Sequence, residues 1–269
     1  MVEIPVKPKP NWSDMTDDEI ARADTSQWIA VLPVAATEQH GLHLPASTDA
    51  DIARTMVNNT VSMLPNTLAV TFLPVQEIGA SAEHGGSSGT ISRDPFDLVT
   101  AWLDIASQLK ASGIQKIVLV SSHGGNTPVC DIIIQRARIE LGMLAVATSW
   151  SRFGYPPGLF SEDEIAFGIH GGDIETSIML AACPKMVDMK RVENFTSLQQ
   201  RLAADMTHLR AYGPHRMGWM IHDLNPVGVV GNASKATAAK GNATIAHQTA
   251  GFIELLQDVQ RFDLTTFKR

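Results

Sequence analysis

The chain has 269 residues, of which 44% are hydrophobic and 18% are charged, and its formal net charge at pH 7 is −7. This composition is typical of a globular protein with room for one sizeable α/β domain. The acidic balance and the lack of a basic run argue against nucleic-acid or membrane-surface binding. Two cysteines, Cys130 and Cys183, are too few for a disulfide framework. With no apolar run near the roughly 20 residues of a membrane span and no signal-peptide pattern, we expect a cytoplasmic protein.

The first part of the chain alternates between predicted strands and helices. Prolines at alternate positions predict an extended arm over residues 1–12, and Ser13 to Ile20 predicts the start of a capped helix. The apolar run of residues 28–35 predicts a buried strand, and apolar side chains at helical spacing predict a helix over residues 49–64. The next expected elements are a strand over residues 68–75, a glycine-rich loop over 79–90 and a helix over 95–112.

The second part continues this alternation. The strand predicted over residues 116–121 is rich in apolar, β-branched side chains, which is typical of a strand covered on both faces. Strands alternating with helices predict a three-layer α/β/α fold around a mostly parallel sheet. We expect residues 1–27 to form the arm and a short helix, and residues 28–269 to form a single domain. A further strand is predicted over residues 143–149, and strand and turn signals occur from 219 to 231. The remaining predicted helices cover residues 127–141, residues from near Gly172 to 182, residues 194–212 and residues 233–260.

Side chains able to bind metal follow every predicted strand. The carboxyl ends of parallel strands lie at one edge of a sheet, where ligands bind, so we expect these side chains to converge. Glycines beside them allow backbone and ligand to approach closely. The set comprises Glu38, His40 and Asp49 after the first strand, with His43 beside them, Glu83 and His84 after the second, His123 after the third, and His170 and Glu175 after the fourth.

This mixture of imidazoles and carboxylates suits Zn²⁺, Mn²⁺ or Fe²⁺ rather than Ca²⁺ or a thiolate-bound metal. An aspartate that bridges two ions, with one Glu and one His for each ion, would make a two-metal site that activates a water molecule. A remaining histidine would be free to move protons near neutral pH. Each side chain also has a simpler interpretation, such as Asp49 as a helix N-cap. The coincidence of several strand ends favours the metal site.

Three motifs stand out along the chain. The first is Glu38-x-His40-Gly-x-His43-Leu-Pro, with Asp49 eleven positions after Glu38. The second is Ser122-His123-Gly124-Gly125-Asn126, and the third is His170-Gly-Gly-Asp-Ile-Glu175-Thr176-Ser177. In kind and order these motifs resemble those of the creatininase family, and the segment from Gly228 to Gly241 is similar to the family's glycine-rich and Ala-Thr segment. The resemblance spans roughly residues 28–255.

This resemblance implies a creatininase-like fold and a hydrolase with two divalent ions per chain, Zn²⁺ and/or Mn²⁺ with Fe²⁺ as an alternative. Glu38 and His123 would hold one ion, and His40 and Glu175 would hold the other. Asp49 would bridge the two ions. His43 would be structural rather than a ligand.

The resemblance also implies the catalytic residues and the assembly. His170 would be the proton-shuttling histidine, with Glu175 beside it at the catalytic centre. Members of the family form higher oligomers, typically hexamers, so a homo-oligomer is expected. The residues expected to contact a small-molecule substrate are Glu83, His84, Ser122 and Trp150, of which Trp150 would form an aromatic wall or simply pack in the core.

Two departures from the family pattern bear on the substrate. Creatininases proper have a Tyr-Glu pair where this chain has Gly124-Gly125, and the Gly-Gly pattern is that of the wider family, which includes deformylases and peptide-trimming enzymes. Ser87 and Ser88 stand where the wider family often has Phe-Pro, which predicts a differently shaped or more polar pocket.

The expected function is hydrolysis of a C–N bond in a small cyclic or linear amide by a metal-bridging hydroxide, with His170 delivering a proton to the leaving nitrogen. Hydrolysis of another carbonyl bond stays open as an alternative, in the form of formamide deformylation, peptide trimming or C–C cleavage of a keto-cyclitol. A non-catalytic sugar- or nucleotide-binding module is a further alternative, although the glycine-rich loop lacks the spacing and lysine of a P-loop.

Overall fold

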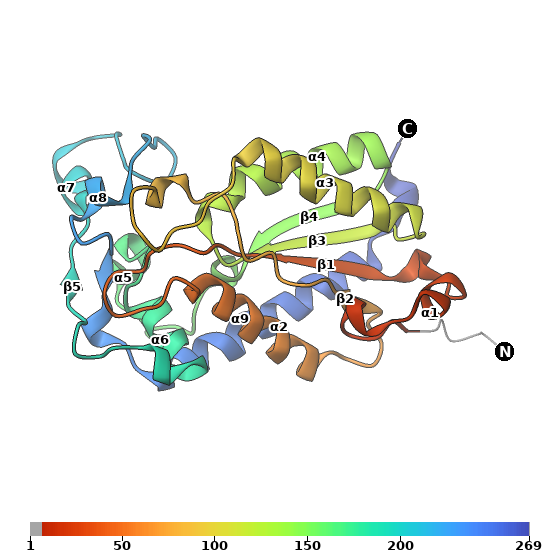
Figure 1. Ribbon diagram of the computed structural model, residues 1–269, viewed down its shortest axis with the longest axis horizontal. Coiled ribbons are helices and arrows are strands. Elements are labelled where there is room, and N and C mark those ends of the chain that lie inside the picture. The colour runs from red at the N-terminus through yellow and green to blue at the C-terminus, as the bar shows by residue number, and fades with distance from the viewer. Residues whose placement is uncertain (1–6, 269) are drawn as a thin grey trace.

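A sheet of four parallel strands forms the centre of the molecule, with the strand order β2-β1-β3-β4. The structure, a computed structural model, describes residues 7–268, so the first six residues of the predicted arm lie outside the described part. Helices cover both faces of the sheet (Figure 1), which confirms the predicted three-layer fold. The strands are β1 (Ile29–Val34), β2 (Val70–Phe72), β3 (Lys116–Ser121) and β4 (Leu144–Ser149).

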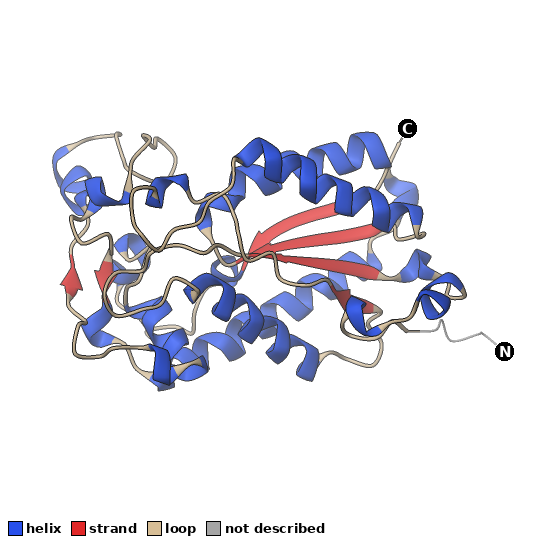
Figure 2. Ribbon diagram, in the orientation of Figure 1, coloured by secondary structure: helices blue, strands red, loops and turns tan. Residues whose placement is uncertain are grey.

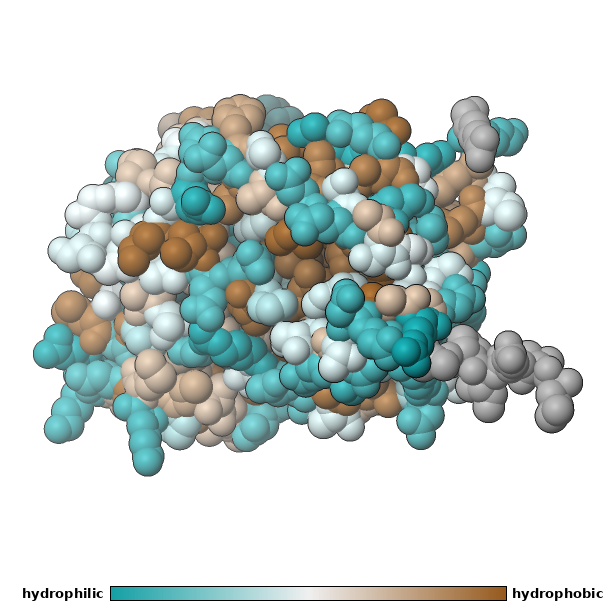
Figure 3. Space-filling view, turned by 45° about the vertical axis from the view of Figure 1, so that its right-hand side comes forward, coloured by the Kyte–Doolittle hydropathy of each residue, from teal (hydrophilic) through white to brown (hydrophobic). Residues whose placement is uncertain are grey.

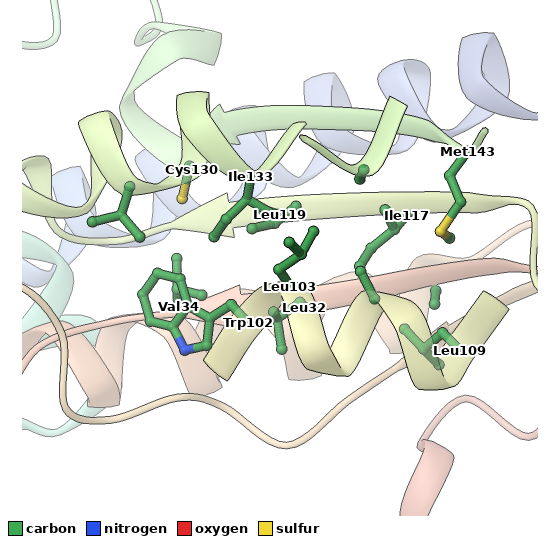
Figure 4. Close-up of a cluster of buried hydrophobic side chains, with 14 of the residues drawn as sticks. Leu32, Val34, Trp102, Leu103, Leu109, Ile117, Leu119, Cys130, Ile133 and Met143 are labelled. Atoms are coloured by element: carbon green, nitrogen blue, oxygen red, sulfur yellow. The ribbon is translucent and has the colours of Figure 1, made fainter. Parts of the chain in front are cut away.

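Each face of the sheet has its own apolar core, because side chains alternate along a strand. Leu32 and Val34 of β1 belong to the core that α3 (Pro95–Ala111) and α4 (Thr127–Leu141) cover, and Figure 4 shows them near Trp102. Ile29 and Val31 belong to the opposite core, which is covered by α2 (Thr48–Met63), α6 (Asp173–Ala182) and α9 (Ala238–Arg261). Burial on both faces explains why β1 and β3 are buried at every position.

The three longest strands end together at one edge of the sheet. Val34 of β1 lies beside Ser121 of β3, which lies beside Ser149 of β4. The chain segments that follow these strands therefore lie side by side, and Figure 2 shows loops and short helices gathered beyond the arrowheads. The elements at this end are α5 (Glu162–Phe167), α7 (Leu198–Asp205), α8 (Ile221–Leu224) and the antiparallel pair β5 (Asn194–Phe195) and β6 (Gly231–Asn232).

Asn126 connects the loops at this edge. Its side-chain amide donates to the carbonyl of Ala35 at 3.0 Å and its oxygen accepts from the amide of Ala80 at 3.0 Å. A Cβ atom at Gly79 would lie 2.6 Å from the Asn126 oxygen, so this close approach requires glycine there. The asparagine of the second motif therefore fixes the segments after β1 and β2 relative to β3.

The structure confirms most predicted elements and corrects several boundaries. The first helix does not begin at Ser13: Thr16 caps α1 (Asp17–Ala21) in a capping box with Glu19. The strand predicted over residues 68–75 narrows to β2. The last helix begins at Ala238 rather than at residue 233, because the Thr237 side chain accepts from the backbone amide of Lys240.

The region between α6 and α9 differs most from the prediction. A continuous helix over residues 194–212 is wrong, because residues 194–195 pair with β6 and only 198–205 are helical, with Ser197 as the cap. The short helix α5 was not predicted, although Ser161 followed by three acidic residues is a recognisable helix start. In the described part of the chain, no helix is both long and apolar enough for a membrane span.

Candidate metal centre

The ends of β1 and β3 and the starts of α2 and α6 bring the predicted metal ligands together. Glu38 and His40 lie on the loop after β1, and Asp49 is the second residue of α2. His123 lies two residues beyond β3, and Glu175 is the third residue of α6. Glu38, His40 and Asp49 are each 1% exposed, so these polar groups lie in the protein interior. Such buried groups need partners of opposite charge or a metal ion.

Asp49 divides its two carboxylate oxygens between two groups of side chains. Its Oδ2 lies 3.4 Å from His123 Nδ1, which is 3.2 Å from Glu38 Oε2. Its Oδ1 lies 3.6 Å from His40 Nε2, which is 3.6 Å from Glu175 Oε2. Within each group the potential ligand atoms all lie within 4.8 Å of one another. The structure thus contains two sets of donors that share one carboxylate.

Two polar atoms between these groups have no hydrogen-bond partner among the described residues. They are His40 Nε2 and Asp49 Oδ2, both buried. An unsatisfied buried donor or acceptor costs about 1–3 kcal/mol. A divalent cation between the donor atoms would remove this cost, and the nitrogen and oxygen donors are those that Zn²⁺ and Mn²⁺ accept. The residues present therefore fit a metal centre.

Backbone carbonyls orient the two imidazoles. His40 Nδ1 lies 3.0 Å from the carbonyl oxygen of Glu38, and His123 Nε2 lies 2.9 Å from that of Ala80. An N–H that donates to a carbonyl at one ring nitrogen leaves the lone pair of the other nitrogen for a metal. Both rings are held so that this second nitrogen faces the Asp49 carboxylate.

Within the cluster, the histidines and the buried carboxylates shift one another's pKa values. Burial alone would lower the pKa of His40, but the Asp49, Glu175 and Glu38 carboxylates raise it to about 9. The pKa of His123 lies well above its ordinary value because Glu38 and Asp49 outweigh its burial. Burial would raise the pKa of Asp49, yet His40 and His123 hold it below its usual range. Burial raises the pKa of Glu175 to about 7 although His40 opposes this.

His170 lies beside the metal-capable groups and differs from them in charge. Its Nε2 is 2.7 Å from the carbonyl oxygen of Gln39, and its Nδ1 is 3.5 Å from Glu38 Oε1. Burial, followed by the neighbouring charges of His40 and His84, holds the pKa of His170 well below its ordinary value. With the Nε2 proton donated to the carbonyl, a neutral ring points its Nδ1 lone pair towards the cluster. The ring can accept a proton there.

Sequence reasoning missed Gln39, which occupies the unassigned position of the Glu-x-His motif. Its side-chain nitrogen donates to the carbonyl of Gly228 at 2.6 Å and lies 3.1 Å from His84 Nδ1. Its backbone carbonyl accepts a hydrogen bond from His170 Nε2. The only signal in the sequence was its position between two candidate ligands. A second missed residue, Ser81, donates its hydroxyl to Glu38 Oε2.

His43 lies outside the three groups of potential ligands. Its Nε2 is 2.9 Å from the carbonyl oxygen of Gly171 and 3.1 Å from Thr176 Oγ1. It also stacks on Phe195 at a ring-centroid distance of 5.8 Å. His43 therefore contacts the segment that carries His170 and Glu175 rather than the cluster itself.

Two cavities meet at the cluster. One, of about 450 Å³, is lined by Trp150 and Tyr155, and the other, of about 490 Å³, is lined by Tyr212, Arg216 and Trp219. The predicted substrate residues line these cavities: Trp150 the first, Glu83 and His84 the second, and Ser122 both. The residues shared by both cavities are Ser122, His123, Gly124, Ile169 and Glu175.

Two of the predicted substrate residues also make structural contacts. The Ser122 hydroxyl donates to the carbonyl of Asp49 at 2.8 Å. Trp150 is 3% exposed and packs edge-on against Phe252 at 4.7 Å between ring centroids. Trp150 therefore both lines the first cavity and packs in the apolar core.

The fold and the cluster together define a class of protein, an α/β protein whose sheet edge carries histidines and carboxylates that could hold a metal ion. Residues 13–256 match the family model named creatininase and described as creatinine amidohydrolase. The chain belongs to the creatininase family and is a hydrolase of that family.

Relatives of known name and structure agree with this membership. The mycofactocin precursor peptide peptidase of Mycobacterium ulcerans is 29% identical over 227 residues, which are 82% of each chain. The creatinine amidohydrolase of Pseudomonas putida is 30% identical over 185 residues, 64% of this chain and 71% of the relative. A crystal structure of creatinine amidohydrolase matches with a TM-score of 0.72 at 21% identity, covering 96% of this chain and 100% of the other, and shows the same fold.

Proposed function

We propose that the chain is an amidohydrolase with two divalent ions, which cleaves a C–N bond in a small amide. The observation that carries the proposal is the division of Asp49 between two sets of donors. In this proposal Glu38 and His123 would hold one ion, and His40 and Glu175 would hold the other. Solved creatininases include one described as a manganese form and a variant described as a Zn–Zn type, which supports Zn²⁺ or Mn²⁺ here.

The two ions would activate a water molecule and polarise the amide carbonyl. The chain's own residues then handle the proton. His170 Nδ1 faces the cluster, so it takes the proton of the attacking water and delivers it to the leaving nitrogen. The contact between His170 Nε2 and the Gln39 carbonyl holds the ring in place during both transfers.

We further propose that the substrate is a linear amide rather than a small ring. The cluster lies where two cavities of about 450 and 490 Å³ meet, so space for a substrate exists on both sides of the reacting bond. A single-ring substrate such as creatinine would leave most of this space empty. Ile52 and Ile178 beside Trp150 suit an apolar group in the first cavity. The relatives named as peptide peptidases support this preference.

A comparison of substrates tests this preference. The metal-loaded enzyme is expected to hydrolyse short peptides with an apolar residue on one side of the cleaved bond at a kcat/KM at least tenfold above that for creatinine, a difference of about 1.4 kcal/mol. The measurement is liberated amine for peptides, formamides and lactams of graded size. Equal or faster turnover of creatinine would overturn the linear-substrate proposal and leave the metal centre untouched.

Metal uptake tests the centre itself. Titration of metal-free protein with Zn²⁺ at pH 7 is expected to load about two ions per chain and to release about two protons. The pKa of His40 is about 9, so its ring is positively charged at pH 7 and loses a proton on binding; the raised pKa of His123 favours the charged ring there too, which would likewise release a proton. Apparent affinity should therefore fall as the pH decreases below about 9.

Calorimetry in buffers with different heats of ionisation measures both the stoichiometry and the protons released. Glu175, with a pKa of about 7, contributes a further fraction of a proton at pH 7. Uptake of less than one ion per chain, or a binding heat that does not depend on the buffer, would contradict the proposed centre.

We also propose that the chain forms a homo-oligomer, as expected for a hexameric family. Several large apolar side chains are exposed, among them Phe96 at 75% and Ile139 at 76%. Figure 3 shows apolar patches set into a largely hydrophilic face. Contiguous exposed apolar surface often marks protein–protein contact.

A further inference from the structure

Gly125 has no room for a side chain. A Cβ atom at this position would lie 2.4 Å from the carbonyl oxygen of Ala80, 2.4 Å from His123 Nε2 and 2.5 Å from Glu83 Oε1. Its φ angle is not positive, unlike that of ten other glycines in the described part of the chain. Glycine is therefore required here by the neighbouring atoms and not by the backbone conformation.

One of these neighbours is a carboxylate that reaches the cluster from a different strand end. Glu83 lies on a short 3-10 helix (Ala82–His84) in the loop after β2. Its Oε1 is 3.4 Å from His123 Nε2, and its side chain is 22% exposed. The space that a side chain at Gly125 would fill is next to this carboxylate.

The Glu83 carboxylate and the candidate ligands contact opposite sides of the His123 ring. Nδ1 faces Glu38 and Asp49 at 3.2 and 3.4 Å, whereas Nε2 faces Glu83 and the Ala80 carbonyl. Glu83 belongs to none of the groups whose ligand atoms lie together. Its geometry is that of a carboxylate behind a metal-binding imidazole, which fixes the ring and makes its other nitrogen a better donor.

We propose that Glu83 is a positioning residue for His123, and that Gly125 is required because it leaves space for the contacts of His123 Nε2 with the Ala80 carbonyl and the Glu83 carboxylate. This inference rests on the proposed two-metal centre. It assigns Glu83 to one ion only, the one held by Glu38 and His123, because among the described residues His40 Nδ1 contacts a backbone carbonyl and no carboxylate. It also differs from the role of substrate contact that the sequence suggested for Glu83.

Site-resolved metal binding tests the proposal. Metal-free wild type and Glu83→Gln are titrated with Co²⁺ against a competing chelator, and the visible absorption of each step is recorded. Glu83→Gln is expected to bind one ion about 10–100-fold more weakly and to bind the other with unchanged affinity. A carboxylate that contacts a metal-binding histidine from behind contributes about that much to metal affinity. Glu77→Gln is the matched control, because Glu77 is exposed and pairs with Arg54 away from the cluster.

A second variant examines the space next to Glu83. Gly125→Ala is expected to weaken the same ion, because the added methyl would displace His123 Nε2 together with the Ala80 carbonyl and the Glu83 carboxylate that contact it. In Glu83→Gln/Gly125→Ala the two effects should not add, as is usual for residues that act through one contact. Circular dichroism of each variant establishes folding, and Glu83→Gln alone decides the matter if Gly125→Ala does not fold.

The outcomes separate the two proposals. Wild type that binds no transition metal would overturn the proposed centre itself. Wild type with two ions, together with unchanged binding of both in Glu83→Gln, would overturn the role of Glu83 and leave the centre intact. A raised KM with unchanged metal binding in Glu83→Gln would likewise overturn it in favour of a substrate contact.

Discussion

Asp49→Asn is expected to lose most of the bound metal and more than about a thousandfold of the hydrolytic activity, which corresponds to ~4 kcal/mol of transition-state stabilisation. Asp49 supplies one oxygen to each of the two donor sets, so one substitution weakens both. The amide has the shape of the carboxylate but not its charge, and α2 can begin as before with Ser47 at its N-cap. Metal content by mass spectrometry and kcat/KM measure the two losses.

Asp51→Asn is the matched control for this prediction. Asp51 lies in the same first turn of α2, but its carboxylate accepts from Ser47 Oγ at 2.7 Å and pairs with Arg54 at 2.7 Å. That variant should retain about two ions and wild-type activity. An Asp49→Asn protein that is folded, keeps both ions and remains active would refute the bridging role.

His170→Ala is expected to retain both ions and to lose about 10²–10⁴-fold in kcat, the usual contribution of general acid–base catalysis. His170 contacts the cluster through Nδ1 at 3.5 Å from Glu38, while the proposed ligands keep their own contacts. The pH profile provides a second readout. Burial and positive neighbours hold the pKa of His170 below 6.5, so the neutral, proton-accepting ring is present above that pKa and lost on the acid side.

The acid limb of the kcat profile should therefore lie below pH 6.5 in wild type and be absent in the variant. His247→Ala, in which an exposed histidine of α9 is replaced, should behave as wild type in both respects. If His170→Ala instead loses metal in proportion to activity, His170 is a ligand, as its proximity to Glu38 and His40 would allow. Unchanged activity would exclude either role.

The central layer was predictable because its signals are local. β3 and α4 have the bounds that the sequence predicted, since apolar β-branched residues continue through the strand and Gly142, with φ of 66°, ends the helix. The region of residues 194–212 was not predictable in this way. Its helix ends at Asp205, and Arg210 then donates to the carbonyls of Leu202, Met206 and Leu209. Such contacts depend on where the chain turns, which periodicity does not indicate.

The positions of the candidate ligands followed from the sequence, but their geometry did not. Strand ends predicted that Glu38, Asp49 and His123 would converge, and the structure places His123 Nδ1 3.2 Å from Glu38 Oε2 and 3.4 Å from Asp49 Oδ2. The sequence could not indicate which ring nitrogen of His123 faces the cluster, because the carbonyl of Ala80, 43 residues earlier in the chain, decides this. The same limit applies to Gln39 and Gly125, whose importance lies in distances between separate loops.

The strand order has a consequence for how substrate preference can change during evolution. β1 and β3 are the inner strands, and the loops that follow them carry Glu38 and His123. β4 is an edge strand, and the segment directly after it, residues 150–160, carries Trp150 and Tyr155 of the first cavity, whereas His170 and Glu175 come only further along the chain. Loops tolerate insertions and substitutions, so changes in that segment put the inner strands at little risk. Libraries for new amide specificity are therefore best directed to the segment after β4.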